Sequence, residues 1–287
     1  MKRLNSTFLT SLVAISASAS DVSTSTTYST VTPTTTLRRP YCKMTQDKDN
    51  GTTNGTTDTL AKNIKQANEI LKTSNIVCFD VDSTIIQEEG IDELADFCGK
   101  GAEVAALTKE AMSGGMTFQE ALKKRLDIIK PSQKQIREFI KNHPSTISPN
   151  VQELFRQLRA NNTEIYLISG GFDCLIEPVA TALQIPLSNL FANKLYFHFN
   201  GSYAGFDTQQ VTSRSGGKGE AIKFIRQKFQ QFNNNESAII TMIGDGATDL
   251  EASPPADYFI GYGGNVVREE VRHRANYYLT NFNQIQL

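Results

Sequence analysis

The sequence predicts an α/β fold: a mostly parallel sheet with helices on both faces, an inserted helical block and a small β-hairpin. Three observations predict it. Short apolar runs alternate with segments of helical periodicity along most of the chain. Residues 88–143 contain helical patterns only. Acidic or hydroxyl residues directly follow several apolar runs, and ligands of such sheets bind beyond the carboxyl ends of the strands.

The composition is that of an ordinary globular protein and argues against several function classes. The chain has 287 residues, enough for one large domain or for a core with an inserted subdomain. A formal net charge of −1 and the lack of a basic stripe argue against nucleic acid as a partner. No apolar run is long enough to span a membrane. The cysteines form no C-x-x-C pair and the histidines no helical ligand pair, so zinc and dithiol redox chemistry are poorly supported.

Residues 1–58 differ from the rest of the chain. Serine and threonine dominate them, so this segment cannot bury enough surface to fold and is predicted to be disordered. A basic start, a weakly apolar stretch interrupted by Thr10 and Ser11, and a Ser/Thr tract with two arginines favour a targeting segment for a plastid or mitochondrion. An untargeted tail of a cytoplasmic protein and a secretory signal are the alternatives.

The folded part is expected to begin with an amphipathic helix at residues 59–72, followed by a buried strand at 76–79. Four helices are predicted next, at residues 91–97, 103–112, 118–129 and 133–141, with Pro131-Ser132 separating the last two. We interpret residues 88–143 as a helical cap inserted into a core of residues 59–87 and 144–287.

Strands and helices alternate again in the remainder of the chain. Helices are predicted at residues 151–159, 173–183 and 219–232, and strands at 164–168, 238–243, 258–261 and 277–280. A hairpin of residues 194–199 and 203–206 surrounds the turn dipeptide Asn200-Gly201. The strand at 164–168 is expected to end in a glycine-rich turn, Ser169-Gly170-Gly171.

Two acidic segments follow buried strands in distant parts of the chain. Asp80 and Asp82 follow the first strand, and Asp245 and Asp249 follow the strand at 238–243. Carboxylates crowded at one sheet edge repel one another unless a cation or a shared proton offsets the charge. Because Mg²⁺ prefers oxygen ligands, we expect Asp80, Asp82 and Asp245 to hold Mg²⁺ and Asp249 to orient its waters. For an isolated pair of carboxylates, a solvated loop is the alternative.

These residues suit phosphoryl transfer. One carboxylate of the first pair can attack phosphorus and form an acyl phosphate, while the other protonates the leaving oxygen and later deprotonates water. The hydroxyl of Ser169 and the N–H groups beside Gly170 suit an anion, and Lys218, on a flexible loop, is a candidate phosphate clamp. Taken alone, a glycine-rich turn and a single lysine are more often structural.

The same motifs mark a resemblance to a family. Asp80-Val-Asp-Ser-Thr84, the strand ending in Ser169, Lys218 and Gly244-Asp-Gly-Ala-Thr-Asp249 resemble the four ordered motifs of the haloacid dehalogenase-like phosphatases. The resemblance covers residues 70–285. It is strongest to the phosphoserine phosphatase family, through residues 80–99, 191–206, 215–219 and 257–268.

The resemblance implies a Rossmann-like core with a four-helix cap, and it implies roles for named residues. Asp80 would be the nucleophile and Asp82 the general acid and base, with Asp80, Asp82 and Asp245 as Mg²⁺ ligands and Asp249 beside them. The implied substrate-binding residues are Glu89, Met112, Arg125, Ser169, Gly170, Gly171, Lys218 and Thr248. Glu89 would pair with the ammonium group of the substrate and Arg125 with its carboxylate, although sequence alone leaves open whether Glu88 or Glu89 faces the pocket.

The resemblance therefore implies a Mg²⁺-dependent enzyme that hydrolyses O-phospho-L-serine to L-serine and phosphate, the last step of serine biosynthesis, through an aspartyl-phosphate intermediate. The alternatives are a related phosphatase for another small phosphomonoester and a non-catalytic protein that binds a phosphorylated ligand. The expected partner is the small-molecule substrate, and a homodimer is left open.

Overall fold

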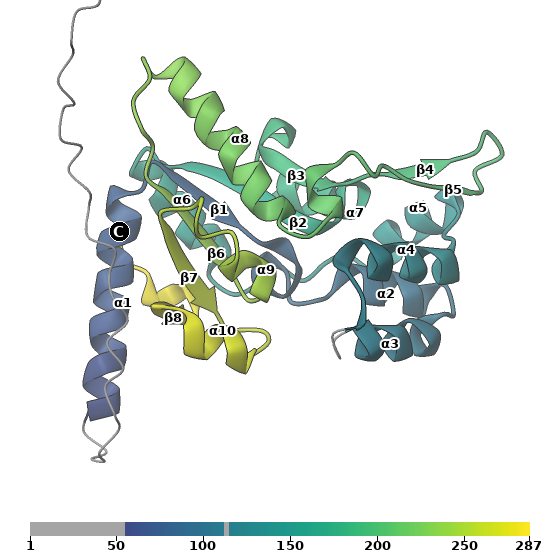
Figure 1. Cartoon of the computed structure of the whole chain (residues 1–287), viewed down its shortest axis with the longest axis horizontal. Helices are drawn as coiled ribbons and strands as arrows, with labels where there is room; N and C mark the ends of the chain where they lie inside the picture. The colour runs from purple at the N-terminus through teal and green to yellow at the C-terminus, as the bar shows by residue number, and fades with distance from the viewer. Residues whose placement is uncertain (1–54, 112–114) are drawn as a thin grey trace, which may run out of the picture. The chain divides into compact units, whose positions relative to one another are not determined.

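The computed structural model describes residues 55–111 and 115–287, and this part is built on a six-stranded parallel sheet (Figure 1). Its strands are β1 Ile76–Phe79, β2 Glu164–Phe172, β3 Leu190–Asn193, β6 Ile240–Gly244, β7 Tyr258–Tyr262 and β8 Tyr277–Leu279. They lie in the order β3-β2-β1-β6-β7-β8, and all adjacent strands are parallel. The strand order reverses between β1 and β6, which is where such sheets bind their ligands.

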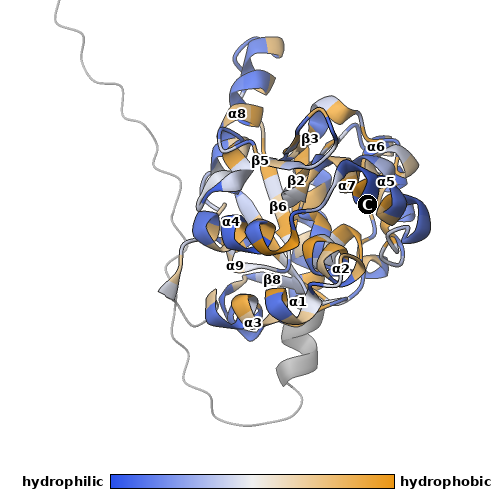
Figure 2. Ribbon diagram, turned by 90° about the vertical axis from the view of Figure 1, so that its right-hand side faces the viewer, coloured by the Kyte–Doolittle hydropathy of each residue, from blue (hydrophilic) through white to orange (hydrophobic). Residues whose placement is uncertain are grey.

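Helices cover both faces of this sheet, as the sequence predicted. Helices α1 (Gly55–Thr73), α6 (Val151–Ala160) and α7 (Asp173–Ala182) pack on one face, and α8 (Gly217–Phe232) and α10 (Glu269–Arg274) on the other. A hydrophobic core lies on each face of the sheet, and alternate side chains of β1 belong to different cores. Val77 and Phe79 are part of the first, and Ile76 and Cys78 are part of the second. Figure 2 shows hydrophobic residues along β2 and β6 between these helical layers.

Four helices lie between β1 and β2. They are α2 (Gly90–Phe97), α3 (Gly101–Glu110), α4 (Phe118–Ile129) and α5 (Gln133–Asn142), each within two residues of its predicted range. Capping boxes at Thr117 and Ser132 fix the starts of α4 and α5. The helices share a small core around Leu94, Ile129 and Phe139. The interpretation of this block as a separate cap stays a prediction.

The predicted hairpin is confirmed and lies against this helical block (Figure 1). Strands β4 (Leu195–Phe197) and β5 (Tyr203–Phe206) are antiparallel, and Gly201 at the turn has a φ of 79°. Leu195 and Phe197 pack against the core of the block, and the N–H of Gln133 donates to the carbonyl oxygen of Gly201 over 2.8 Å.

Two predicted boundaries near the expected site are wrong. Strand β2 continues through Ser169-Gly170-Gly171 to Phe172, because these residues stay extended and pairing with β3 resumes at Phe172. Helix α8 begins at Gly217, so Lys218 lies in its first turn rather than on a flexible loop. Strand β3, α10 and the short helix α9 (Ala247–Leu250) were not predicted, since each is too short for a periodic signal.

Other predictions concern the N-terminal segment and the membrane. Residues 1–54 and 112–114, including Met112, lie outside the described residues, but α1 already begins at Gly55, within the segment predicted to be disordered. Among the helices of the described ranges, none combines the length and the apolar character needed to cross a membrane.

Candidate active site

The turn after β1 places two aspartates in different directions. The N–H of Asp80 donates to the carbonyl oxygen of Ile243 in β6, so this residue still belongs to the sheet. The chain then turns through Val81–Ile85, with Ser83 at a φ of 54° and the N–H of Ile86 returning to the carbonyl oxygen of Val81. This tight turn separates the surroundings of Asp80 and Asp82, although only one residue lies between them.

Three buried carboxylates meet between β1 and β6. One oxygen from each of Asp80, Asp245 and Asp249 lies within 4.8 Å of the other two. The Nζ atom of Lys218 lies 2.8 Å from Asp80 and 2.6 Å from Asp249, and Nε of Arg268 lies 2.7 Å from Asp245. Asp80 and Asp245 were predicted to meet here, and Asp249 joins them directly, whereas the side chain of Asp82 is not in this group.

The charge of this cluster is not balanced by the cationic side chains that contact it among the described residues. Three carboxylates face two cationic side chains, Lys218 and Arg268. Burial and the neighbouring Asp80 raise the pKa of Asp245 and Asp249 above the ordinary value. Burial lowers the pKa of Lys218, but Asp249 and Asp80 outweigh burial and raise it. A hard divalent cation fits a buried, oxygen-only donor set with excess negative charge.

The carboxylate of Asp82 faces the helical block and β2 instead. Its Oδ1 accepts from the N–H of Gly90 (2.7 Å) and its Oδ2 from the hydroxyl of Ser169 (3.0 Å). A Cβ on Gly171 would lie 2.9 Å from Oδ2, so that glycine makes room for the carboxylate. Burial, and then the charge of Asp80, raise the pKa of Asp82 to about 6. Such a pKa suits a group that gives and takes a proton near neutral pH.

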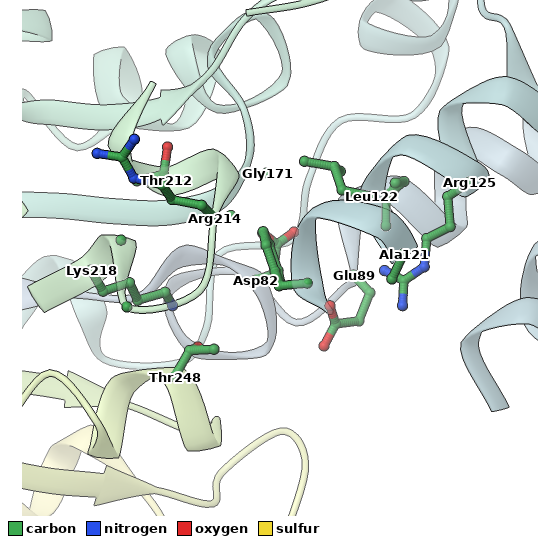
Figure 3. Close-up of a pocket in the computed structure, with 15 residues that line it drawn as sticks. Asp82, Glu89, Ala121, Leu122, Arg125, Gly171, Thr212, Arg214, Lys218 and Thr248 are labelled. Atoms are coloured by element: carbon green, nitrogen blue, oxygen red, sulfur yellow. The ribbon is translucent and has the colours of Figure 1, made fainter. Parts of the chain in front are cut away.

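A cavity of about 160 Å³ opens beside Asp82. Figure 3 shows Lys218 and Thr248 on one side of it, Asp82 in the middle, and Glu89 and Arg125 on the other side. One end of the cavity, next to the carboxylate cluster, therefore contains the cationic side chain of Lys218. The other end contains one acidic side chain, Glu89, and one basic side chain, Arg125. The remaining lining residues are Ile91, Phe118, Ala121, Leu122, Gly170, Gly171, Thr212, Arg214, Gly216 and Gly217.

The end of the cavity in the helical block contains two charged groups suited to a zwitterion. The Nε atom of Arg125 is buried and has no hydrogen-bond partner among the described residues. Burial and the charge of Asp82 raise the pKa of Glu89 to about 7. Glu89 lines this cavity, whereas both carboxylate oxygens of Glu88 accept from the N–H of Thr146. The geometry thus places Glu89, not Glu88, at the pocket.

The glycine-rich end of β2 lies against the helical block. A Cβ on Gly170 would lie 2.9 Å from the ring of Phe118, at the start of α4. The hydroxyl of Ser169, predicted to bind an anion, accepts from the N–H of Gly171 (2.8 Å) while it donates to Asp82. Its predicted contact with phosphate stays a prediction.

Sequence reasoning missed several residues of the site. Arg268, in the segment between β7 and α10, contacts both Asp245 and Glu89, although no spacing in the sequence connects these three positions. Thr84 donates to Asp245, and it could have been assigned because it lies in the same motif as Asp80. Phe118 and Arg214 line the cavity, and no signal in the sequence sets them apart from other helix and loop residues.

Comparisons with known proteins agree with this geometry. The family model described as haloacid dehalogenase-like hydrolase matches residues 75–257. The chain is 58% identical over 243 residues to a phosphoserine phosphatase of Drosophila melanogaster, covering 82% of this chain and 88% of the relative. It is 47% identical over 228 residues to the chloroplastic phosphoserine phosphatase of Arabidopsis thaliana, covering 78% and 75% of the two chains.

A solved structure gives the same result for the fold. The crystal structure of a phosphoserine phosphohydrolase-like protein from Francisella tularensis superimposes with a TM-score of 0.60 at 30% sequence identity. The match covers 74% of this chain and 97% of the other.

Proposed function

Since this chain belongs to the phosphoserine phosphatases of the haloacid dehalogenase-like hydrolase family, we propose that it hydrolyses O-phospho-L-serine to L-serine and phosphate. The observation that supports this most is the layout of one cavity. A cationic end beside the buried carboxylates suits a phosphate group, and an end with Glu89 and Arg125 suits the ammonium and carboxylate groups of serine.

Asp80 is the nucleophile in this proposal. Its carboxylate attacks phosphorus, and the bond between phosphorus and the serine oxygen breaks as an aspartyl phosphate forms. Lys218, 2.8 Å from Asp80, neutralises charge on the attacking carboxylate and on the phosphoryl oxygens. The N–H groups around Gly170 and Gly171 and the hydroxyls of Ser169 and Thr248 complete the phosphate site.

Asp82 moves the proton in both halves of the reaction. It first donates to the serine oxygen that leaves, and it then takes a proton from the water that attacks the aspartyl phosphate. Its pKa of about 6 leaves both protonation states accessible near neutral pH. The hydrogen bonds from Gly90 and Ser169 hold its carboxylate beside the cavity.

Mg²⁺ is the proposed cofactor, with Asp80 and Asp245 as ligands, Asp249 beside them and Asp82 as the third predicted ligand. When bound, the ion offsets the repulsion between the nucleophile and the phosphate oxygens. The oxygens of Asp80, Asp245 and Asp249 within 4.8 Å of one another and the excess negative charge support a cation at Asp80 and Asp245, whereas the carboxylate of Asp82 lies outside this group.

Two further parts of the proposal concern the whole protein. The chloroplastic relative from Arabidopsis thaliana supports a targeting role for the N-terminal segment, with a plastid or mitochondrion as the destination. Closure of the helical block over the substrate would exclude bulk water during the reaction. A homodimer stays a prediction.

The test compares phosphate release from O-phospho-L-serine with that from a simple aryl phosphate. Glu89→Gln and Arg125→Gln should each lower kcat/KM for phosphoserine by about ten- to a hundredfold, because a charged group of serine loses its partner. The aryl phosphate should be affected much less. Lys123→Gln, on the exposed face of the same helix as Arg125, is the control and should leave both substrates unchanged. Equal losses for the two substrates in the Glu89 and Arg125 variants would remove the amino-acid assignment.

A further inference from the structure

The segment between β7 and α10 crosses back over the site. Nδ2 of Asn265 donates to the carbonyl oxygens of Ser83 (3.0 Å) and Ile86 (3.2 Å) and to the hydroxyl of Ser148 (2.7 Å). Val271, in α10, is buried in the core on one face of the sheet. The contacts of Asn265 and Val271 therefore hold this segment in place on both sides of Arg268, next to the turn that contains Asp82.

Arg268 spans two parts of the site. Its Nε donates to Oδ2 of Asp245 over 2.7 Å, and its Nη2 donates to Oε1 of Glu89 over 2.8 Å. Asp245 is a fixed anchor, because its side chain is only 2% exposed and Thr84 donates to its other oxygen. The planar guanidinium group of Arg268 therefore links Glu89, at the start of the helical block, to the fixed carboxylate of Asp245.

Glu89 depends on this contact for its orientation. It precedes α2, and its side chain is 40% exposed, so packing holds it only in part. Oε1 accepts from both Arg268 and the hydroxyl of Ser83, while no described residue donates to Oε2. The two donors to Oε1 thus hold the carboxylate at the cavity and leave its second oxygen available to a ligand.

Arg268 itself is absent from the described residues that line the cavity. Among the described residues, its contacts at the site are with Glu89 and Asp245. From these contacts we infer that Arg268 is a positioning residue: it holds Glu89 for the ammonium group of the substrate and so contributes to selectivity for amino-bearing phosphate esters. This inference rests on the proposed function, and it deepens the role of the same site.

Three substrates separate this role from others. O-Phospho-L-serine has an ammonium group, a carboxylate and a phosphate. 3-Phosphoglycerate has a hydroxyl in place of the ammonium group, and O-phosphoethanolamine lacks the carboxylate. A residue that positions Glu89 should affect the first and third substrates and leave the second nearly unchanged.

Arg268→Gln is expected to lower kcat/KM for O-phospho-L-serine and O-phosphoethanolamine by about tenfold or more, mainly through KM, because a charged hydrogen bond to Glu89 is lost. Arg268→Lys should recover part of the loss for both. Arg272→Gln is the control: it removes the same charge at an exposed position in α10, where the ion pair seen among the described residues is with Glu269, and it should match the unmodified protein. Binding of the first two esters, measured by calorimetry in an Asp80→Asn background, should show the same selectivity without turnover.

A double variant tests directly whether Arg268 acts through Glu89. If Arg268 acts through Glu89, Arg268→Gln should add little to the loss already caused by Glu89→Gln. Additive losses, or an equal loss for 3-phosphoglycerate, would overturn the inference while leaving the phosphatase assignment intact. Absence of phosphoserine hydrolysis by the unmodified protein would instead reject the proposed function itself.

Discussion

Asp80 and Asp82 are separated by one residue and yet have different electrostatic surroundings. Asp80 faces the ammonium group of Lys218, whereas Asp82 accepts from a backbone N–H and a hydroxyl. Asp80 therefore faces a cation, while burial and the charge of Asp80 raise the pKa of Asp82. This difference supports the proposed roles of Asp80 as nucleophile and Asp82 as proton donor.

The raised pKa of Asp82 predicts how stability depends on pH in the absence of metal. In the unfolded chain an aspartate titrates near pH 4, but in the fold Asp82 titrates near 6, so the fold favours its protonated form. The stabilisation is complete below the unfolded pKa and is lost as the pH rises through the folded pKa. Relative to the unmodified protein, Asp82→Asn should therefore become more stable from about pH 4 to about pH 7, by on the order of a few degrees in Tm.

Calorimetry in a chelating buffer measures this difference. Subtracting the two melting temperatures at each pH isolates the contribution of Asp82 from that of other titrating groups. A difference that stays constant across the range would show that Asp82 is not held protonated by the fold.

The residues of the sequence motifs could be predicted from the sequence, but the residues that hold them in position could not. Asp80 and Asp245 follow from acidic residues placed directly after apolar runs, whereas Lys218, on a glycine-rich segment, is a candidate only in the company of those motifs. Arg268 reaches Asp245 only because the segment after β7 is tied to the turn after β1 by Asn265, 182 residues from Ser83. No local pattern encodes a contact that depends on the path of a distant loop.

The start of α8 determines where Lys218 lies. Gly216 has a φ of 74°, and it lets the chain enter the helix directly at Gly217. A Cβ on Gly217 would lie 1.9 Å from the carbonyl oxygen of Val211, so the helix start packs against backbone. This close contact fixes the first turn of α8 and with it the lysine between Asp80 and Asp249.

Gly217→Ala should therefore displace the first turn of α8 and reduce phosphatase activity, by about a hundredfold, because small misplacements of a catalytic group are costly. Gly99→Asn is the control, since nothing lies within 4 Å of a Cβ there, asparagine tolerates its positive φ, and Gly99 does not line the cavity. It should keep most of the activity. Steady-state kinetics with O-phospho-L-serine measure both, and full activity in Gly217→Ala would contradict the rigid role given to this turn.

Helices of several turns and strands that are apolar throughout could be predicted from the sequence. The ranges of β1 and α4 agree with the structure at both ends. The glycines of β2 were predicted as a turn, since glycine commonly marks one, but here they stay extended to give Asp82 and Phe118 room. The extended conformation of this segment is set by tertiary contacts, which the local sequence pattern does not encode.

At the scale of the whole molecule, the described chain from α1 onward forms both cores and the site. Ala67 and Leu71 of α1 are fully buried in the first core, so this helix belongs to the folded unit. None of the residues assigned to the site lies before Asp80. The site should therefore not depend on residues 1–54.

Removal of residues 1–54 should leave kcat/KM for O-phospho-L-serine and the melting temperature unchanged within error. Removal of residues 1–73 should instead cost several kcal/mol, because it exposes the core surface that α1 covers, and should yield little folded protein. Circular dichroism and phosphate release measure the two outcomes. Loss of folded protein in the shorter truncation would place part of the segment within the domain.

The central claim is that Asp80 becomes phosphorylated and that Asp82 is needed to release the phosphate. Rapid acid quenching of Asp82→Asn, mixed with O-phospho-L-serine and Mg²⁺, tests it most directly. We predict that an acid-stable, hydroxylamine-sensitive phosphoryl group accumulates on the peptide that contains Asp80, and that it is absent without Mg²⁺ or in Asp80→Asn. Phosphate release at the normal rate in Asp82→Asn, or a phosphoryl group on any other residue, would contradict the account.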